Sequence, residues 1–131
     1  MDRYPTLKAY ERSWAQSDET QIRAWLTQCW TPTSTYVNAF TDTVSGLDGL
    51  TRLIMDYPVL FPDAQITPRG EQDAHHQHAR YCWRLSSTAR IRILGRDFGC
   101  ALDGLDIIEF DRDDKIKSVV AFFGCPGTMM A

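Results

Sequence analysis

Apolar residues recur at helical spacing in the first half of the chain and at alternate positions in the second half. Spacings of three and four residues predict helices, and a spacing of two predicts strands. Three helical stripes come first: Leu7, Tyr10 and Trp14; then Ile22, Trp25, Leu26 and Cys29; then Leu47, Leu50, Ile54 and Tyr57. The period changes near Ala64, which predicts three helices followed by a run of strands.

The ends of these helices carry signals of their own. Pro5 suits the first turn of the first helix, where a backbone N–H has no helical partner. Asp18 with Gln21 resembles a capping box at the start of the second helix. Pro58 and Pro62 limit the end of the third helix, because proline interrupts helical hydrogen bonds.

The strands are predicted from alternation and from their β-branched and aromatic residues. A short strand separates the second and third helices, and the others follow the change of period. The predicted strands cover residues 35–40, 64–74 (interrupted at Pro68 and Gly70), 79–85, 90–94 and a hairpin over 105–123 with its turn at Asp111–Asp114.

A chain of 131 residues is long enough for one hydrophobic core and too short for two. Helices followed by a run of strands are typical of the α+β class. We therefore predict a single domain over residues 1–131, in which three N-terminal helices pack on a strongly curved antiparallel sheet.

Composition narrows the choice of partners and compartment. A net charge of −3 without any cluster of lysine and arginine argues against a nucleic-acid partner. No apolar run has membrane-spanning length and the N-terminus does not resemble a signal peptide, so we expect no membrane partner and a cytoplasmic location. The four cysteines lack Cys-x-x-Cys spacing, which favours thiols over a disulfide or a zinc site: Cys29, Cys82, Cys100 and Cys125.

One residue of the final hairpin stands out. Asp106 begins an otherwise apolar strand, and a carboxylate there needs a partner, an opening to solvent, or a proton. Strand alternation puts Ile108 on the same inner face and, across the hairpin, Val119, Ala121 and Phe123. Val120 and Phe122 would then point outward, and exposed apolar residues on a sheet favour a homodimer.

Two other choices stay open from the pattern alone. In the strand over 79–85, either Tyr81 and Trp83 face inward, or Arg80 and Arg84 do and the pocket suits an anion. His76 and His78 could share a strand face and ligate a metal, although no third ligand has a recognisable spacing, and His75 or His76 could serve as a base. We expect exposed turn histidines, with no metal and no cofactor.

The order of elements, together with three stretches, resembles the nuclear transport factor 2-like superfamily. The stretches are Tyr10 to Asp18, Tyr36-Val37-Asn38-Ala39 with Ser45-Gly46, and Leu105-Asp106 to Phe123-Gly124. The superfamily includes ketosteroid isomerase and the SnoaL-like polyketide cyclases. The resemblance implies a cone-shaped α+β fold, whose open end admits a small apolar molecule and whose outer sheet face commonly forms a dimer.

The resemblance to ketosteroid isomerase also implies roles for individual residues. Tyr10 falls at the oxyanion-hole tyrosine, and Asp106 at the protonated aspartic acid that donates the second hydrogen bond. The base position holds Asn38-Ala39, and an amide accepts no proton at neutral pH. Asp42 is the substitute base that lies nearest in sequence. Trp14, Asn38 and Trp83 are expected to line the ligand pocket together with the inner-face residues.

Three functions fit these expectations. The first is an isomerase, cyclase or dehydratase that acts through an enol on a small carbonyl compound, with Tyr10 and Asp106 as oxyanion donors. The second is a non-catalytic protein that binds a small apolar or carbonyl-containing molecule, which the missing base at Asn38 favours. The third is a dimerisation module. Fold alone does not decide among them.

Overall fold

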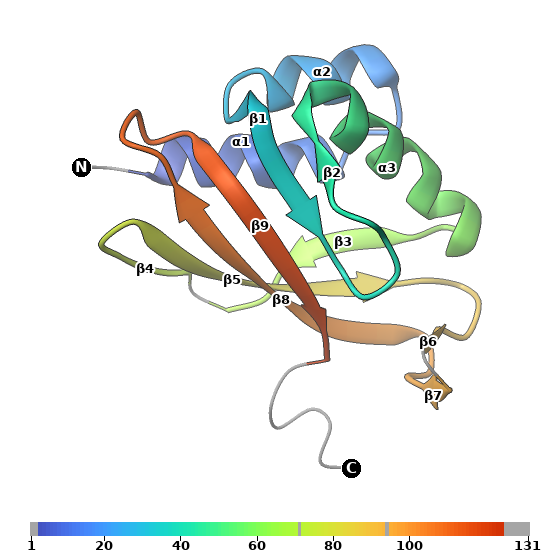
Figure 1. The fold of residues 1–131 in the computed structure, drawn as a ribbon. Helices are drawn as coiled ribbons and strands as arrows, with labels where there is room; N and C mark the ends of the chain where they lie inside the picture. The colour runs from blue at the N-terminus through green and yellow to red at the C-terminus, as the bar shows by residue number, and fades with distance from the viewer. Residues whose placement is uncertain (1–2, 71, 94, 125–131) are drawn as a thin grey trace.

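Three helices lie on one side of a curved sheet (Figure 1). The computed structural model describes residues 3–70, 72–93 and 95–124, so Leu94 and Cys125 lie outside the described residues. The helices are α1 (Tyr4–Trp14), α2 (Glu19–Leu26) and α3 (Gly46–Leu60). The strands are β1 (Trp30–Val37), β2 (Val44–Ser45), β3 (Gln65–Pro68), β4 (Asp73–His75), β5 (His78–Ser86), β6 (Arg92–Ile93), β7 (Arg96–Asp97), β8 (Ala101–Phe110) and β9 (Ile116–Phe123).

The helix signals have the expected physical basis. The Asp18 carboxylate accepts a hydrogen bond from the backbone N–H of Gln21 and so caps α2. The third helix includes Pro58 in its last turn and ends at Leu60, two residues before Pro62. At its start, Gly46 has φ of +73°, a backbone conformation that favours glycine.

The strands form one large sheet in the order β2-β1-β9-β8-β5-β3, with β4 paired to β5. The α+β architecture with three helices on a curved sheet is confirmed. One detail differs from the expectation, because β1 runs parallel to β9 and the sheet is therefore mixed. Parallel neighbours need a long connection, and most of the chain lies between these two strands.

Two predicted strands have different bounds in the structure. The strand expected over 35–40 begins earlier, at Trp30, and ends at Val37. Asn38 ends it, because its side-chain oxygen accepts hydrogen bonds from the backbone N–H groups of Phe40 and Thr41 and so forms a turn. Among the described residues of the segment over 90–94, Arg92–Ile93 forms the strand β6, which pairs with β7 in a separate small sheet.

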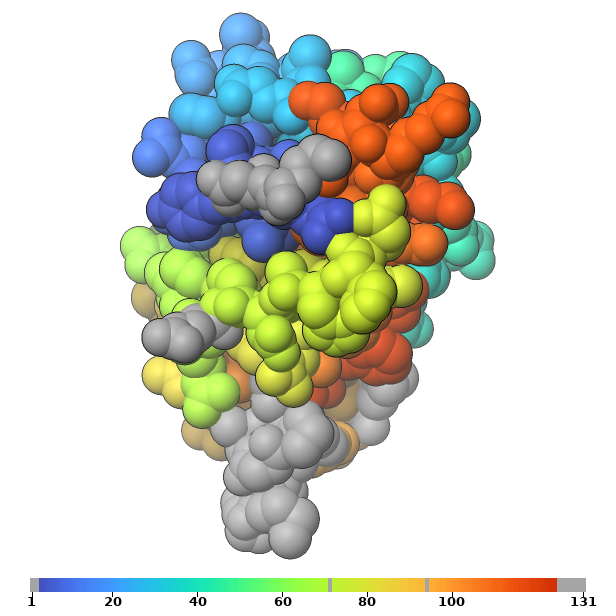
Figure 2. All heavy atoms as spheres, turned by 90° about the vertical axis from the view of Figure 1, so that its left-hand side faces the viewer, coloured from blue at the N-terminus to red at the C-terminus, as the bar shows by residue number. Residues whose placement is uncertain are grey.

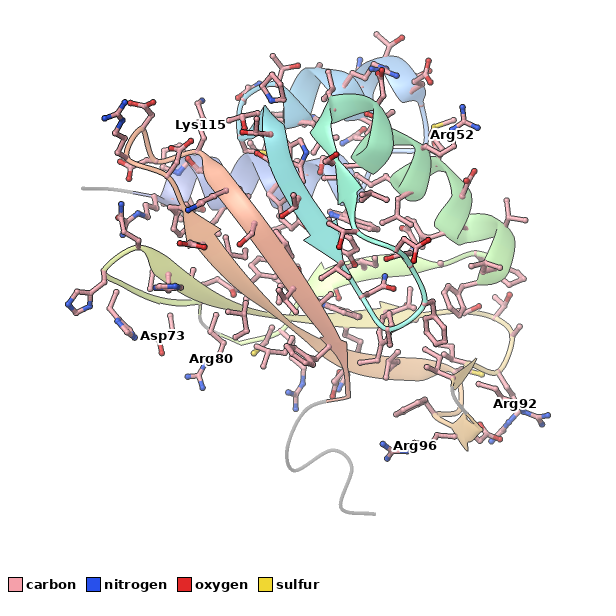
Figure 3. The ribbon with its side chains drawn as sticks, viewed as in Figure 1. Arg52, Asp73, Arg80, Arg92, Arg96 and Lys115 are labelled. Atoms are coloured by element: carbon pink, nitrogen blue, oxygen red, sulfur yellow. The ribbon has the colours of Figure 1, made fainter. Side chains whose placement is uncertain are left out.

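The faces of β5 are now settled. Tyr81 and Trp83 are buried on the inner face, whereas Arg80 and Arg84 are exposed. Figure 3 shows Arg80 directed away from the sheet, where its guanidinium lies 3.1 Å from the Asp73 carboxylate. The pocket is therefore not lined by these arginines.

A buried aspartate, Asp103, binds one of these two arginines, Arg84. Asp103 lies on the opposite face of β8 from Asp106, and Arg84 donates two hydrogen bonds to it at 2.7 and 3.2 Å. Arg69 adds an ion pair at 3.2 Å. The hydrogen bond from Arg84 is the main cause that holds the pKa of Asp103 below its usual value, so this carboxyl stays ionised.

The N-terminal end of α1 meets two turns on one side of the molecule (Figure 2). The Arg3 guanidinium donates hydrogen bonds to Gln77 in the β4–β5 turn and to Asp114 in the β8–β9 turn. Thr6 donates a further one to the Asp114 carbonyl at 2.7 Å. These contacts fix the position of α1 over the sheet, and hence the position of Tyr10 one turn further along.

The described part of the chain bears on the expected thiols and on membrane-spanning helices. Cys29, Cys82 and Cys100 are free thiols, and Cys125 is not described. None of the helices in that part of the chain is long and apolar enough to cross a membrane.

Gly104 gives a direct test of how the sheet positions Trp83. A Cβ added at Gly104 would lie 2.1 to 2.4 Å from three atoms of the Trp83 ring, so Gly104→Ala should displace the indole. We expect the free energy of unfolding in urea to fall by about 1–3 kcal/mol.

The matched control is Gly49→Ala in α3. Its added Cβ would lie 3.4 Å from the nearest atom, an ordinary contact, and alanine favours a helix. The free energy of unfolding of this variant should be higher than that of the wild type by about 0.5–1 kcal/mol. A Gly104→Ala protein as stable as the wild type would show that the indole does not depend on this glycine.

Candidate functional site

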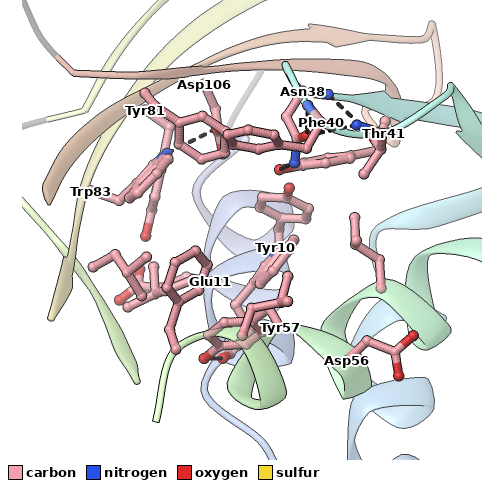
Figure 4. Close-up of a pocket in the computed structure, with 18 residues that line it drawn as sticks. Tyr10, Glu11, Asn38, Phe40, Thr41, Asp56, Tyr57, Tyr81, Trp83 and Asp106 are labelled. Carbon is pink, nitrogen blue, oxygen red and sulfur yellow. Dashed lines mark hydrogen bonds between the residues drawn. The ribbon is translucent and has the colours of Figure 1, made fainter. Parts of the chain in front are cut away.

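A cavity of about 130 Å³ lies between the helices and the inner face of the sheet (Figure 4). Half of its 18 lining residues are aromatic. They come from α1, α3, the turn after β1, and strands β1, β3, β5, β8 and β9, so the cavity exists only in the folded chain. An engineered dry cavity of about 150 Å³ holds benzene, and a benzene-sized molecule is therefore a suitable occupant.

Asp106 lies at one end of this cavity. The register between β5 and β8 pairs Tyr81 with Asp106 and Trp83 with Gly104. Because Gly104 has no side chain, the Trp83 ring lies over it and its N–H donates a hydrogen bond to Asp106 Oδ1 at 2.9 Å. No other described residue forms a hydrogen bond with the Asp106 side chain.

Burial dominates the ionisation of Asp106. The residue is only 5% exposed, and burial disfavours the charged form and raises its pKa. The hydrogen bond from Trp83 acts in the opposite direction, and the resulting pKa is about 7. Asp106 therefore exchanges between its neutral and charged forms at physiological pH.

Tyr10 faces the same end of the cavity from α1. Its ring stacks on Trp30 with centroids 6.1 Å apart, and only 1% of the residue is exposed. Its hydroxyl has no hydrogen-bond partner among the described residues. Burial and the nearby Asp106 carboxyl raise the pKa of Tyr10 well above its ordinary value, so the hydroxyl keeps its proton.

A second unpartnered donor lies one helical turn further along α1. The indole N–H of Trp14 is buried and has no hydrogen-bond partner in the described part of the chain. The Trp14 ring lies edge-on to Tyr10 with centroids 6.4 Å apart, and its N–H helps to lower the pKa of Tyr10 without the geometry of a hydrogen bond. Two buried donors beside one cavity are suited to an acceptor brought by a ligand.

Asn38 also lines the cavity, and both its side-chain oxygen and its side-chain nitrogen have partners within the protein. Its oxygen holds the turn through Phe40 and Thr41, and its amide nitrogen donates to the Tyr36 hydroxyl at 3.3 Å. Burial raises the pKa of Tyr36, so this hydroxyl too remains neutral. Asn38 is thus a positioning residue for the turn and for Tyr36.

The other expected site residues have different surroundings. Trp14, Trp83 and Phe123 line the cavity with Tyr10, Asn38 and Asp106. Ile108, Val119 and Ala121 are buried in the core and do not line it. Asp42 is exposed in the turn after β1, and it does not line the cavity either. The histidines lie at the exposed β4–β5 turn, away from the cavity.

Twelve of the 18 lining residues were not among the expected site residues, and those that carry polar groups include Glu11, Tyr36, Tyr57 and Tyr81. Tyr81 and Tyr57 carried a signal, since one alternates with Trp83 and the other ends the apolar stripe of α3. The Trp83–Asp106 hydrogen bond had none, because it depends on the register between strands that are 15 residues apart at their nearest ends.

Several solved structures have a similar architecture. A SnoaL-like protein from Agrobacterium tumefaciens, presumed to be an isomerase, is 24% identical with a TM-score of 0.75, covering 92% of this chain and 95% of that one. A presumed SnoaL-like polyketide cyclase from Jannaschia is 14% identical with a TM-score of 0.67, covering 97% and 90%. A Catenulispora acidiphila protein of ketosteroid isomerase-like fold, solved with trimethylamine, is 14% identical with a TM-score of 0.68, covering 91% and 85%.

The chain has the SnoaL-like, nuclear transport factor 2-like fold. No model of a known protein family matches the sequence, and no curated protein matches it either. The cavity lies where the helices and the curved sheet enclose space, with Tyr10 contributed by α1 and Asp106 by β8.

The balance of forces on Asp106 can be tested with a single substitution. Trp83→Phe keeps a ring over Gly104 but removes the N–H that favours the charged carboxylate. We expect the pKa of Asp106, followed by the NMR shift of its carboxyl carbon, to rise above about 7.

Trp14→Phe is the control, since Trp14 donates no hydrogen bond to Asp106. The pKa of Asp106 should stay near 7 in this variant. A fall in the pKa of Asp106 after Trp83→Phe would contradict the described balance of forces.

Proposed function

We propose that this protein binds a small carbonyl compound in its cavity and promotes formation of the enol. One observation carries this proposal. The buried Tyr10 hydroxyl, which has no hydrogen-bond partner among the described residues, and the buried, ionisable Asp106 carboxyl both line one largely apolar cavity. The SnoaL-like isomerase and cyclase names of the structural neighbours support the same class of reaction.

Each of the two residues has a role. The Tyr10 hydroxyl would donate a hydrogen bond to the carbonyl oxygen and stabilise the negative charge that develops there. Asp106 in its charged form would accept the proton from the adjacent carbon and return it to the enol. A pKa of about 7 is well matched to proton transfer at neutral pH.

The neutral form of Asp106 would instead act as a second donor to the same oxygen, as the resemblance to ketosteroid isomerase implies. The two roles have opposite pH dependence. If Asp106 is the base, the rate should rise with pH through about 7 and then level. If Asp106 is the donor, the rate should fall over the same range as its proton is lost.

A specific observation favours a second function, namely binding without chemistry. Asn38 stands where the resemblance places the base, and its side chain is occupied by the turn and by Tyr36. Asp42 is exposed outside the cavity and offers no replacement. A non-catalytic protein would use Tyr10 and Asp106 only to hold a polar group.

Hydrogen–deuterium exchange separates these functions even while the natural substrate is unidentified. Small ketones and aldehydes such as cyclohexanone and phenylacetaldehyde are incubated with the protein in D₂O, and exchange beside the carbonyl is followed by NMR. We expect Asp106→Asn to slow exchange by about 10²–10⁴-fold. Tyr10→Phe should slow it by about 10²–10³-fold.

Asp42→Asn is the matched control, because it removes a carboxylate from the exposed turn. With this variant, deuterium exchange of the added compound should proceed at the wild-type rate. Binding of these compounds without any promoted exchange would favour the non-catalytic function. Exchange that survives Asp106→Asn would remove Asp106 from the chemistry.

We also propose that the outer sheet face forms a homodimer. Ile107 and Val120 are direct partners across β8 and β9, and Phe122 lies two residues from Val120 on the same face. All three are exposed, Phe122 to 53%. Together they form an apolar patch that association with a second copy would remove from water.

Light scattering tests the dimer. The wild type should have about twice the chain mass of 15.0 kDa. Phe122→Lys should shift it toward the monomer, because a charge would be buried at the interface. The control Val59→Lys replaces an exposed residue of α3 and should stay dimeric. A monomeric wild type at high micromolar concentration would rule out this interface.

A further inference from the structure

The cavity carries acidic groups without basic ones. Asp106, Glu11 and Asp56 are among its lining residues, and none of the described lining residues is lysine, arginine or histidine. Asp56 is exposed at the rim, and Glu11 lies 3.5 Å from Lys8, which is outside the lining. The buried carboxyl, Asp106, has no cationic partner at all among the described residues.

The walls around these carboxyls are aromatic rings set at an angle to one another. Trp14 is inclined by 43° to Tyr36 and by 54° to Tyr57, with centroids 5.8 and 5.4 Å apart. Trp83 and Phe123 meet nearly at right angles, 82°, with centroids 6.0 Å apart. Inclined rings around a small space are the arrangement in which proteins bind alkylammonium groups, because the negative ring faces attract a cation.

An independent observation points to a ligand at this end of the cavity. Tyr10 is 1% exposed and lines the cavity, and its hydroxyl has no hydrogen-bond partner among the described residues. Such buried unpartnered groups are rare in folded proteins and are commonly completed by a bound molecule or water. Figure 4 shows this hydroxyl directed toward the end where Asp106 and Asn38 lie.

We propose that the ligand of this cavity is an organic ammonium compound, with its positive charge beside Asp106 and its apolar part among the aromatic rings. The proposal rests on the proposed role of the cavity as a small-molecule site, but not on any catalysis there. A volume of about 130 Å³ limits the enclosed part of the ligand to about the size of benzene.

Electrostatics favours a cation in this cavity for two reasons. A buried carboxylate without a cation is costly, so a ligand that brings the cation removes that cost when it binds. An anionic ligand would instead meet the Asp106 carboxyl and no cation among the described lining residues, so the cavity selects against it. The Tyr10 hydroxyl is left to bind a carbonyl, hydroxyl or ether oxygen of the same ligand.

Pairs of matched probes test the sign of the charge. Choline is compared with 3,3-dimethyl-1-butanol, which replaces the ammonium nitrogen by carbon, and benzylammonium with benzyl alcohol. Binding is followed by calorimetry and by the fluorescence of Trp14 and Trp83, which line the cavity. We expect each cation to bind at least about tenfold more tightly than its neutral counterpart at pH 8.

The variants show where the charge is bound. Asp106→Asn keeps an oxygen that can accept from Trp83 and should weaken binding of both cations by at least about tenfold, while the neutral probes lose little. Glu109→Gln is the control. Glu109 lies on the same strand as Asp106, but its carboxylate pairs with Lys117 outside the cavity. Its affinities should equal those of the wild type.

The pH dependence gives a further readout. The groups that face Asp106 are Tyr10 from α1, Tyr36 from β1, and Tyr81 and Trp83 from β5. The tyrosines have raised pKa values and stay neutral, so Asp106 is the group that changes charge near pH 7. Cation affinity should therefore rise as the pH rises through about 7, and the affinity of the neutral probes should not.

The outcomes separate this proposal from the proposed function. If neutral probes bind as tightly as the cations, or if Asp106→Asn leaves cation binding unchanged, the ammonium proposal is wrong and the carbonyl site stands. If cations and neutral probes both fail to bind with a Kd below about 10 mM, the cavity is not a small-molecule site and both proposals fail.

Discussion

The structure depends on one unusual constraint, a carboxyl group that is buried in an apolar cavity without a cation. Asp106 is held there by the central strand β8, which pairs with β5 over residues 101–109 and with β9 over residues 104–110. The Trp83 N–H partly offsets the cost of burial, and Gly104 leaves the space in which that indole lies. The same chain keeps its other buried aspartate, Asp103, ionised with Arg84 on the opposite face. A difference of three positions on one strand thus decides whether a carboxyl is a structural anion or an ionisable group in the cavity.

Much of the fold could be predicted from the sequence because periodicity is a local property. The change from helical spacing to alternation near Ala64 gave the α+β class, and alternation along β8 and β9 placed Asp106, Val119 and Ala121 on the inner face. The mixed sheet could not be predicted in this way, because the parallel pairing of β1 with β9 joins residues about 80 positions apart. The turn at Asn38 was also missed, since its side chain competes with the sheet for the backbone N–H groups of Phe40 and Thr41.

The site was less predictable than the fold for the same reason. Tyr10 and Asp106 came from the resemblance to ketosteroid isomerase, and the structure shows that both line one cavity. The resemblance predicted neither the Trp83–Asp106 hydrogen bond nor the unpartnered Trp14 N–H. These features depend on strand register and on how α1 lies over the sheet. The inner face of a strand is also not the same as a cavity wall. Ile108 and Val119 face inward, but other side chains cover them completely. Solved structures of low sequence identity show the fold, and the chemistry has to be argued from these few side chains.

A crystal structure of the protein with a benzene-sized polar compound, cyclohexanone or benzylammonium, tests the central claim most directly. We expect the ring to lie in the cavity among Trp14, Tyr57 and Trp83. We also expect the polar atom to lie within about 3 Å of the Tyr10 hydroxyl or the Asp106 carboxyl. A ligand whose polar atom points out of the cavity mouth, or a cavity that holds only water while the compound binds elsewhere, would contradict this claim.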